Sequence, residues 1–202
     1  MRFYVYKRAL MLTAATIALR SGPAYAADNT PHKTSVDGNI DLTQALTIPS
    51  SSDANTTPAI TIDSNNTVTI AANGSISFTG TPSATGILEQ VGHTGETIVA
   101  GGIDLTGAGI SKTGILIGNP SGGGGTFTGI TDTTNNSFTT DPTAVVLQSG
   151  SVIKVQGDGS DGIRLASGST LAGDIIVQGT VGMTPSNLNA TTSTSPITGI
   201  EL

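Results

Sequence analysis

Pairs of glycine-initiated apolar segments recur along the chain at a distance of twelve residues, and this repeat constrains the fold more than any other feature. The first and second members of the pairs begin at Gly74 and Gly86, Gly102 and Gly114, and Gly150 and Gly162, with Asn187 and Gly199 as a fourth pair in which asparagine replaces glycine. Self-similarity at a fixed spacing is typical of folds in which similar units stack. We therefore expect equivalent segments to lie above one another.

The segments themselves have the pattern of short β-strands. Ile60–Ile62 and Val68–Ile70 alternate apolar and β-branched polar residues, which predicts strands with one buried face. Residues that tolerate turns separate them, as in Asp63–Asn66 and Ala72–Gly74. Almost no segment keeps a helical period for more than one turn, so we predict an all-β chain.

Two all-β arrangements are compatible with these strands. Hairpins would use two-residue turns such as Asn73-Gly74 and Asp158-Gly159. A coil explains the recurrence better, because each Gly-Ile segment would then add an aliphatic side chain to one interior column. A single turn of about 20 residues loses roughly 1–2 kcal/mol of backbone freedom per residue. Burying four or five aliphatic side chains returns only about 1.5–3 kcal/mol each, so the turns must stack.

The first 26 residues have the pattern of a secretory signal peptide. A basic segment containing Arg2, Lys7 and Arg8 precedes the apolar run Ala9–Leu19, and Ala24-Tyr25-Ala26 matches a small-x-small cleavage site. The apolar run is shorter than the about 20 residues that a transmembrane helix needs. We therefore predict export, with cleavage after Ala26.

Composition excludes several functions for the exported part. Beyond residue 26, four basic residues stand against all 14 acidic ones, a formal charge of −10, which argues against nucleic-acid binding. The chain has no cysteine, which excludes disulfides and thiolate metal sites. Only three aromatic residues follow residue 26, so platforms for stacking bases or sugars are scarce.

The signal peptide, the absence of cysteine and the repeats of Ser160–Leu165 and Gly168–Ile175 resemble the passenger region of a bacterial autotransporter (type V secretion). The resemblance covers about residues 60–202. It implies a right-handed parallel β-helix on, or released from, a Gram-negative cell surface. It also implies a non-enzymatic structural or adhesive role, an outer-membrane translocation barrel as partner, and contacts with host surfaces or other cells.

We divide the chain accordingly into a signal peptide (1–26), an N-terminal cap or irregular segment (27–59) and β-solenoid repeats with irregular loops (60–202). The last repeat stops at Leu202, within an expected strand, and the three phenylalanines after residue 26 are too few for the aromatic girdles of the membrane barrel that autotransporters carry. We therefore expect an incomplete solenoid, truncated at its C-terminal end. An apolar cross-section exposed at that end predicts self-association.

Several local motifs suggest specific sites, and each also has a simpler explanation. Gln156–Arg164 nearly matches a calcium-binding nonapeptide, but it occurs once rather than in tandem, which favours an ordinary turn. Gly122–Gly125 lacks the Gly-Lys-Ser/Thr of a phosphate-binding loop, so we predict a flexible loop there. His32 and His93, the latter near Glu96, have no second histidine at ligand spacing, and we expect both to be solvated loop residues.

The main alternative function is a carbohydrate-active β-helix enzyme, a polysaccharide lyase or hydrolase. Such chemistry needs paired carboxylates, or a calcium site with a basic residue. Asp158, Asp161 and Arg164 are close in sequence but fit a turn and the strand after it. We therefore predict no catalytic residues, no metal site and no cofactor, and a protein that is not an enzyme.

Overall fold

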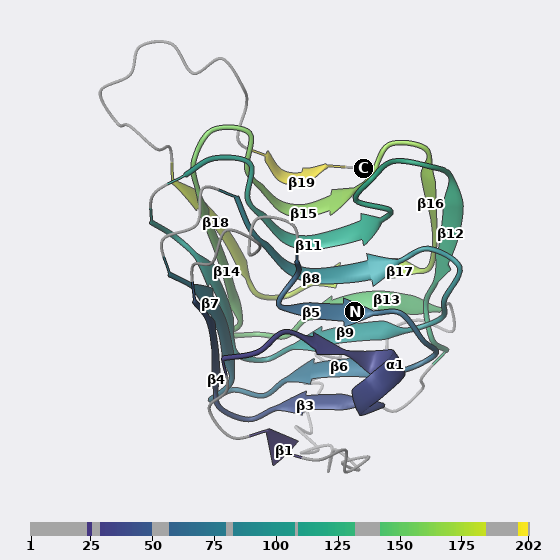
Figure 1. Ribbon diagram of the computed structural model, residues 1–202, viewed down its shortest axis with the longest axis horizontal. Helices are drawn as coiled ribbons and strands as arrows, with labels where there is room; N and C mark the ends of the chain where they lie inside the picture. The colour runs from purple at the N-terminus through teal and green to yellow at the C-terminus, as the bar shows by residue number, and fades with distance from the viewer. Residues whose placement is uncertain are drawn as a thin grey trace, which may run out of the picture.

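A computed structural model describes residues 24–25, 29–49, 57–79, 83–107, 109–131, 142–184 and 198–201. These residues form a parallel β-helix, in which the chain passes through three sheets in turn and then returns to the first (Figure 1). Every pairing between named strands is parallel. The predicted all-β, parallel β-helical fold is confirmed, and the hairpin alternative is wrong.

Three long sheets form the walls of the coil. Sheet A contains β1 (Ala24–Tyr25), β3 (Ile40–Leu42), β6 (Thr67–Ile70), β9 (Glu96–Val99), β13 (Thr143–Leu147) and β17 (Asp174–Val177). Sheet B contains β4 (Ala45–Ile48), β7 (Ser75–Phe78), β10 (Gly102–Leu105), β14 (Val152–Gln156) and β18 (Thr180–Thr184). Sheet C contains β2 (His32–Lys33), β5 (Ile60–Ile62), β8 (Thr85–Gln90), β11 (Thr113–Gly118), β15 (Asp161–Leu165) and β19 (Thr198–Glu201).

One passage through sheets C, A and B makes a rung. The first rung consists of β2, β3 and β4, together with the four-residue helix α1 (Thr34–Asp37). The next two rungs are β5–β7 and β8–β10. The fourth and fifth, β11–β14 and β15–β18, each contain one more strand, and β19 begins a sixth. The segment 27–59, expected to be a cap or an irregular first turn, thus contributes the strands of the first rung.

Aliphatic side chains stack in columns inside the coil, as the Gly-Ile repeat predicts. In sheet C, strand register aligns Ile60, Ile87, Ile115, Ile163 and Ile200. The first four of these are fully buried. Each rung therefore covers the apolar side chains of the rung below it, which is the nearest-neighbour burial that stabilises solenoids.

The second glycines of the repeat form a column beside these isoleucines. Gly86, Gly114, Gly162 and Gly199 occupy equivalent positions in successive strands. A Cβ atom at Gly86 would lie 2.5 Å from the Gly114 carbonyl oxygen, and one at Gly162 would lie 2.6 Å from the Gly199 carbonyl oxygen. Glycine recurs here because the backbone of the next rung occupies the space that a side chain would need.

The first glycines do not keep a common register, so the expected twelve-residue equivalence is wrong at these positions. Gly102 aligns with Ser75 rather than Gly74, and with Val152 rather than Gly150. Gly150 instead lies in a turn with φ of 89°, a conformation that favours glycine. The corners between sheets B and C differ in length, and they absorb these offsets of one residue at Gly74 and two residues at Gly150.

A short extra sheet replaces part of the loop predicted around Gly122–Gly125. β12 (Gly125–Thr128) pairs with β16 (Ser169–Ala172) of the following rung, and Phe127 from β12 is fully buried. The prediction of a continuous flexible loop is therefore wrong at Gly125–Thr128. Two successive rungs carry insertions at the same corner, and these insertions pair with each other.

Parts of the predicted organisation lie outside the described residues. These are most of the signal peptide, the fourth repeat start at Asn187, and Leu202. Ala24–Tyr25, at the predicted cleavage site, pair with Asp41–Leu42 as β1. Among the described residues, no helix is long and apolar enough to span a membrane.

The glycine column gives a direct test of the rung spacing. Gly114→Ala should lower the free energy of unfolding by about 1–3 kcal/mol, because its Cβ would lie 2.6 Å from Ile153 Cγ2 and closer still to the Gly162 carbonyl oxygen. Gly102→Ala is the matched control, since a Cβ there meets only the Val152 carbonyl oxygen at 3.6 Å. Urea unfolding should show the control at least as stable as wild type. Equal effects of both substitutions would contradict the account.

Candidate functional site

A shallow groove of about 500 Å³ crosses the outer face of sheet B. It spans β7, β10 and β14, and β7 and β14 are labelled at the left side of the coil in Figure 1. Its polar lining residues alternate along the strands with buried Ile76, Ile103 and Ile153, of which Ile103 also borders the groove. The residues that line the groove are Ser75, Ser77, Phe78, Thr79, Gly102, Ile103, Asp104, Thr106, Val152 and Lys154.

A row of polar side chains runs across this groove. Strand register places Ser77 beside Asp104, and Asp104 beside Lys154. Asp104 Oδ1 accepts hydrogen bonds from the Thr106 N–H at 3.0 Å and the Thr106 hydroxyl at 2.6 Å. Within the described part of the chain, neither Asp104 Oδ2 nor the Lys154 ammonium has a hydrogen-bond or ion-pair partner. The groove therefore presents one free carboxylate oxygen and one free ammonium.

A buried acid lies at a different place, at the corner between sheets C and A. Glu89 aligns with Ile62 on one side and Ile117 on the other, so it occupies an aliphatic column. Its side chain is fully buried, and neither carboxyl oxygen has a hydrogen-bond partner among the described residues.

Burial is the main cause of an unusual pKa at this position. The pKa of Glu89 is raised from 4.5 to about 8, mainly by burial, and the neighbouring carboxyl of Glu96 contributes to the increase. The nearby Thr97 hydroxyl lowers the pKa of Glu89, although it does not reach hydrogen-bond geometry with that carboxyl group. Glu89 is therefore largely protonated at pH 7. A perturbed acid often indicates a functional site, but this one is enclosed in the core, where no substrate reaches it.

Glu89 makes stability depend on pH. The folded state holds its proton more tightly than the unfolded chain does, so the free energy of unfolding should fall as pH rises from about 4.5 to about 8. Glu89→Ile, which matches Ile62 and Ile117, should remove most of this slope and add at least about 2 kcal/mol at pH 8. Urea unfolding across this pH range measures both effects.

The control for this prediction is Glu201→Gln, at an exposed acid. This variant should keep the pH dependence of the wild type. A wild-type stability that is constant or increases between pH 5 and 8 would contradict the assignment of Glu89 as a buried neutral acid.

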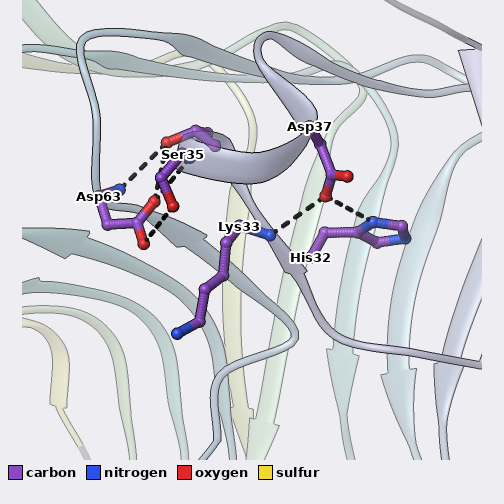
Figure 2. A network of polar contacts seen from close by, with 6 residues as sticks. His32, Lys33, Ser35, Asp37 and Asp63 are labelled. Carbon is purple, nitrogen blue, oxygen red and sulfur yellow. Dashed lines mark hydrogen bonds and ion pairs between the residues drawn. The ribbon is translucent and has the colours of Figure 1, made fainter.

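A polar network joins the first rung to the second (Figure 2). The side chain of the N-cap residue Lys33 makes no hydrogen bond that caps α1. Asp63, from the second rung, instead accepts hydrogen bonds from the Ser35 N–H and the Ser35 hydroxyl, both at 2.8 Å. Asp63 thus acts as a helix cap contributed by a residue far along the sequence.

His32 belongs to the same network. Its Nδ1 lies 3.0 Å from Asp37 Oδ2, which also accepts a hydrogen bond from the Lys33 N–H. His32 lies in β2, aligned with Ile60 at the base of the isoleucine column, and is only 6% exposed. The expectation of a solvated loop histidine is therefore wrong for His32, because its strand pairs with β5 and its side chain is buried next to Ile60 in the register of sheet C.

The Asp63 cap should be sensitive to acid. Burial raises the pKa of Asp63, but the hydrogen bonds from Ser35 outweigh it, and the net pKa lies below 3.8. Its stabilisation should therefore be complete above pH 4 and be lost as pH falls through this lowered pKa. Asp63→Ala should lose about 1 kcal/mol and increase amide exchange at Gly38, whose N–H bonds to the Thr34 carbonyl.

Asp174→Ala is the control, because the Asp174 side chain makes no hydrogen bond or ion pair among the described residues. It should leave exchange at Gly38 unchanged. Equal exchange at Gly38 in the wild type and in Asp63→Ala would show that Asp63 does not cap α1.

The calcium-like segment Gln156–Arg164 forms a turn and a strand that pack on the preceding rung. The Asp158 carbonyl accepts a hydrogen bond from the Ser111 N–H, and Ser160 Oγ accepts one from the Lys112 N–H. Asp161 is 4% exposed and lies 3.6 Å from Arg164. Burial raises the pKa of Asp161, while Arg164 lowers it. These contacts account for the segment as a structural corner.

The other sequence motifs do not converge on a common site. His93 lies in the turn between β8 and β9, where its carbonyl accepts a hydrogen bond from the Thr128 N–H. Glu96 begins β9 and is 2% exposed. Gly122–Gly124 are exposed and precede β12. The described residues contain no group of three or more His, Cys, Asp or Glu side chains placed to hold a metal ion.

The chain matches no family model. Comparisons with curated proteins and with solved structures also find no match.

Sequence reasoning missed both the groove and Glu89, and only Glu89 has a signal in the repeat. Aligning Gly86-Ile87-Leu88-Glu89 with Gly114-Ile115-Leu116-Ile117 places Glu89 at an inward, aliphatic position. The groove depends on which outward residues of β7, β10 and β14 become neighbours. That information comes only from the register between rungs.

Proposed function

We propose that this chain is an exported passenger fragment of a bacterial autotransporter, with a non-enzymatic structural or adhesive role at a Gram-negative cell surface or outside the cell. The parallel β-helix is the observation that carries this proposal. The fold suits display, because the inward columns stabilise it and leave the outward residues free to vary. The signal-like segment at residues 1–26 supports export.

The outer face of sheet B supports an adhesive role over a purely structural one. Its groove carries hydroxyl groups, a carboxylate and an ammonium, none of which belongs to the hydrophobic core. Contacts with a host surface or another cell would use this outer face. The proposed partner in export is an outer-membrane translocation barrel.

Self-association at the C-terminal end of the coil is part of the same proposal. The inward residues of the first rung, Ile40, Leu42, Leu46 and Ile48, are at most 3% exposed. In the fifth rung, Ile175 and Val181, which align with Ile40 and Leu46 through the intervening strands, are only partly buried, and so are Leu165 and Leu171. The apolar interior is therefore more accessible at the fifth rung, and a second copy could cover it.

The alternative of a carbohydrate-active enzyme has less support. Asp161 is buried beside Arg164, and the backbone around Asp158 is used in packing between rungs. These groups stabilise a corner rather than face a cleft. The alternative would replace our proposal if the purified chain degraded a polysaccharide and Asp161→Asn, with its fold retained, abolished that activity.

Export gives the test of the proposal. Expressed in a Gram-negative host, the full chain should be recovered outside the cytoplasm with Ala27 as its new N-terminus, as N-terminal sequencing would show. When fused to a translocation barrel, it should become accessible to external protease. Replacing Arg2, Lys7 and Arg8 with acidic residues is the control, and it should retain the chain in the cytoplasm. A wild-type chain that stays cytoplasmic with Met1 intact would contradict the proposal.

A further inference from the structure

We propose that the groove on sheet B binds a neutral oligosaccharide. This inference rests on the proposed adhesive function for its biological use, and it names the class of ligand that the adhesive surface would recognise. Three properties of the described residues support it: the shape of the groove floor, the kind of polar groups that line it, and its charge.

The groove floor is shaped by a glycine on the outer face of the central strand. Gly102 lies between Ser75 and Val152 in adjacent strands. A Cβ atom there would meet only the Val152 carbonyl oxygen, at 3.6 Å, so neither close packing nor a left-handed backbone requires glycine. Its effect is to leave open space. The resulting volume of about 500 Å³ lies within the range of about 300–1,000 Å³ that small-molecule sites occupy.

The groups around this space match a ligand that carries both donors and acceptors. Four lining residues, Ser75, Ser77, Thr79 and Thr106, contribute hydroxyl groups, which can donate and accept hydrogen bonds. Two of them already have one partner within the chain: the Ser77 hydroxyl bonds to the Thr47 hydroxyl, and the Thr106 hydroxyl donates to Asp104 Oδ1. Asp104 Oδ2 accepts hydrogen bonds only, and the Lys154 ammonium donates only. Adjacent hydroxyl groups on a sugar ring satisfy all three kinds of partner at short spacing.

Two other classes of ligand fit less well. A peptide that adds a strand needs a free sheet edge, but β7, β10 and β14 each pair with a strand on both sides. A polyanion would be repelled by a chain with a net charge of −6. Within the groove, the charges of Asp104 and Lys154 cancel. An uncharged, hydroxyl-rich chain is therefore the ligand that the groove fits best. Because aromatic residues are scarce in this protein, recognition of such a ligand would rest on hydrogen bonds rather than on ring stacking.

Titration of the full chain with cellohexaose, laminarihexaose and chitohexaose by isothermal calorimetry tests this proposal. Hexagalacturonate serves as the anionic comparison. At least one neutral hexasaccharide should bind, and more tightly than hexagalacturonate. Amide chemical shifts should change at Ser77, Asp104 and Lys154.

Gly102→Val should weaken this binding at least tenfold, because the new side chain fills the groove floor. Gly182→Val is the matched control. Gly182 belongs to β18, where it aligns with Lys154 of β14, and it lies outside the groove. A Cβ atom at Gly182 would meet only the Ile153 carbonyl oxygen, at 3.9 Å. Circular dichroism should show both variants folded, and Gly182→Val should bind as the wild type does. Asp104→Asn offers a second test that leaves the space open, and it should also weaken binding.

No binding of any neutral hexasaccharide would overturn the inference. Binding that survives both Gly102→Val and Asp104→Asn, or tighter binding of hexagalacturonate, would do so as well. The result of the binding experiment does not affect the interpretation of the export experiment. A chain that reaches the cell surface but binds no hexasaccharide would refute the ligand, and binding by a chain that is not exported would refute the autotransporter role.

Discussion

Parallel pairing between rungs is the interaction on which the rest of the structure depends. A strand of four to six residues cannot bury enough apolar surface to remain ordered alone. In the coil, a strand between two rungs has its backbone groups paired on both sides and its inward side chains covered from above and below. Ile87 illustrates this arrangement, because it lies between Ile60 and Ile115 and is fully buried. The glycine column beside it keeps the rungs close enough for these contacts.

Pairing between rungs divides the strand residues into inward positions, which are covered by neighbouring rungs, and outward positions, which face solvent. Inward positions must be apolar, so a polar side chain there has a measurable cost, as the raised pKa of Glu89 indicates. Outward positions face no such requirement. On sheet B, β7, β10 and β14 therefore carry serine, glycine, aspartate and lysine over an apolar interior. A surface of this kind can acquire binding groups without changing the fold, which links the architecture to the proposed adhesive role.

The repeat predicted the fold because its strongest signal, Gly-Ile, reports a feature that all rungs of sheet C share. It failed where rungs differ. The offset between Gly74 and Gly102 arises in corners of unequal length, and β12 forms because the next rung has a matching insertion. His32 has no local pattern that predicts burial, since its position depends on pairing with Ile60. The groove, likewise, joins residues from three rungs that are far apart in sequence.

The stacking of the rungs can be tested most directly by cross-linking, which is convenient because the chain has no cysteine. Ser77 and Asp104 are neighbours in adjacent parallel strands of sheet B, whereas Ser77 and Thr85 lie in different sheets. Strands in one sheet are about 4.8 Å apart, which is within the range that a disulfide spans. On mild oxidation, the double variant Ser77→Cys/Asp104→Cys should form an intramolecular disulfide, and Ser77→Cys/Thr85→Cys should not. The opposite result would indicate that consecutive strands pair as hairpins, and it would contradict the β-helix.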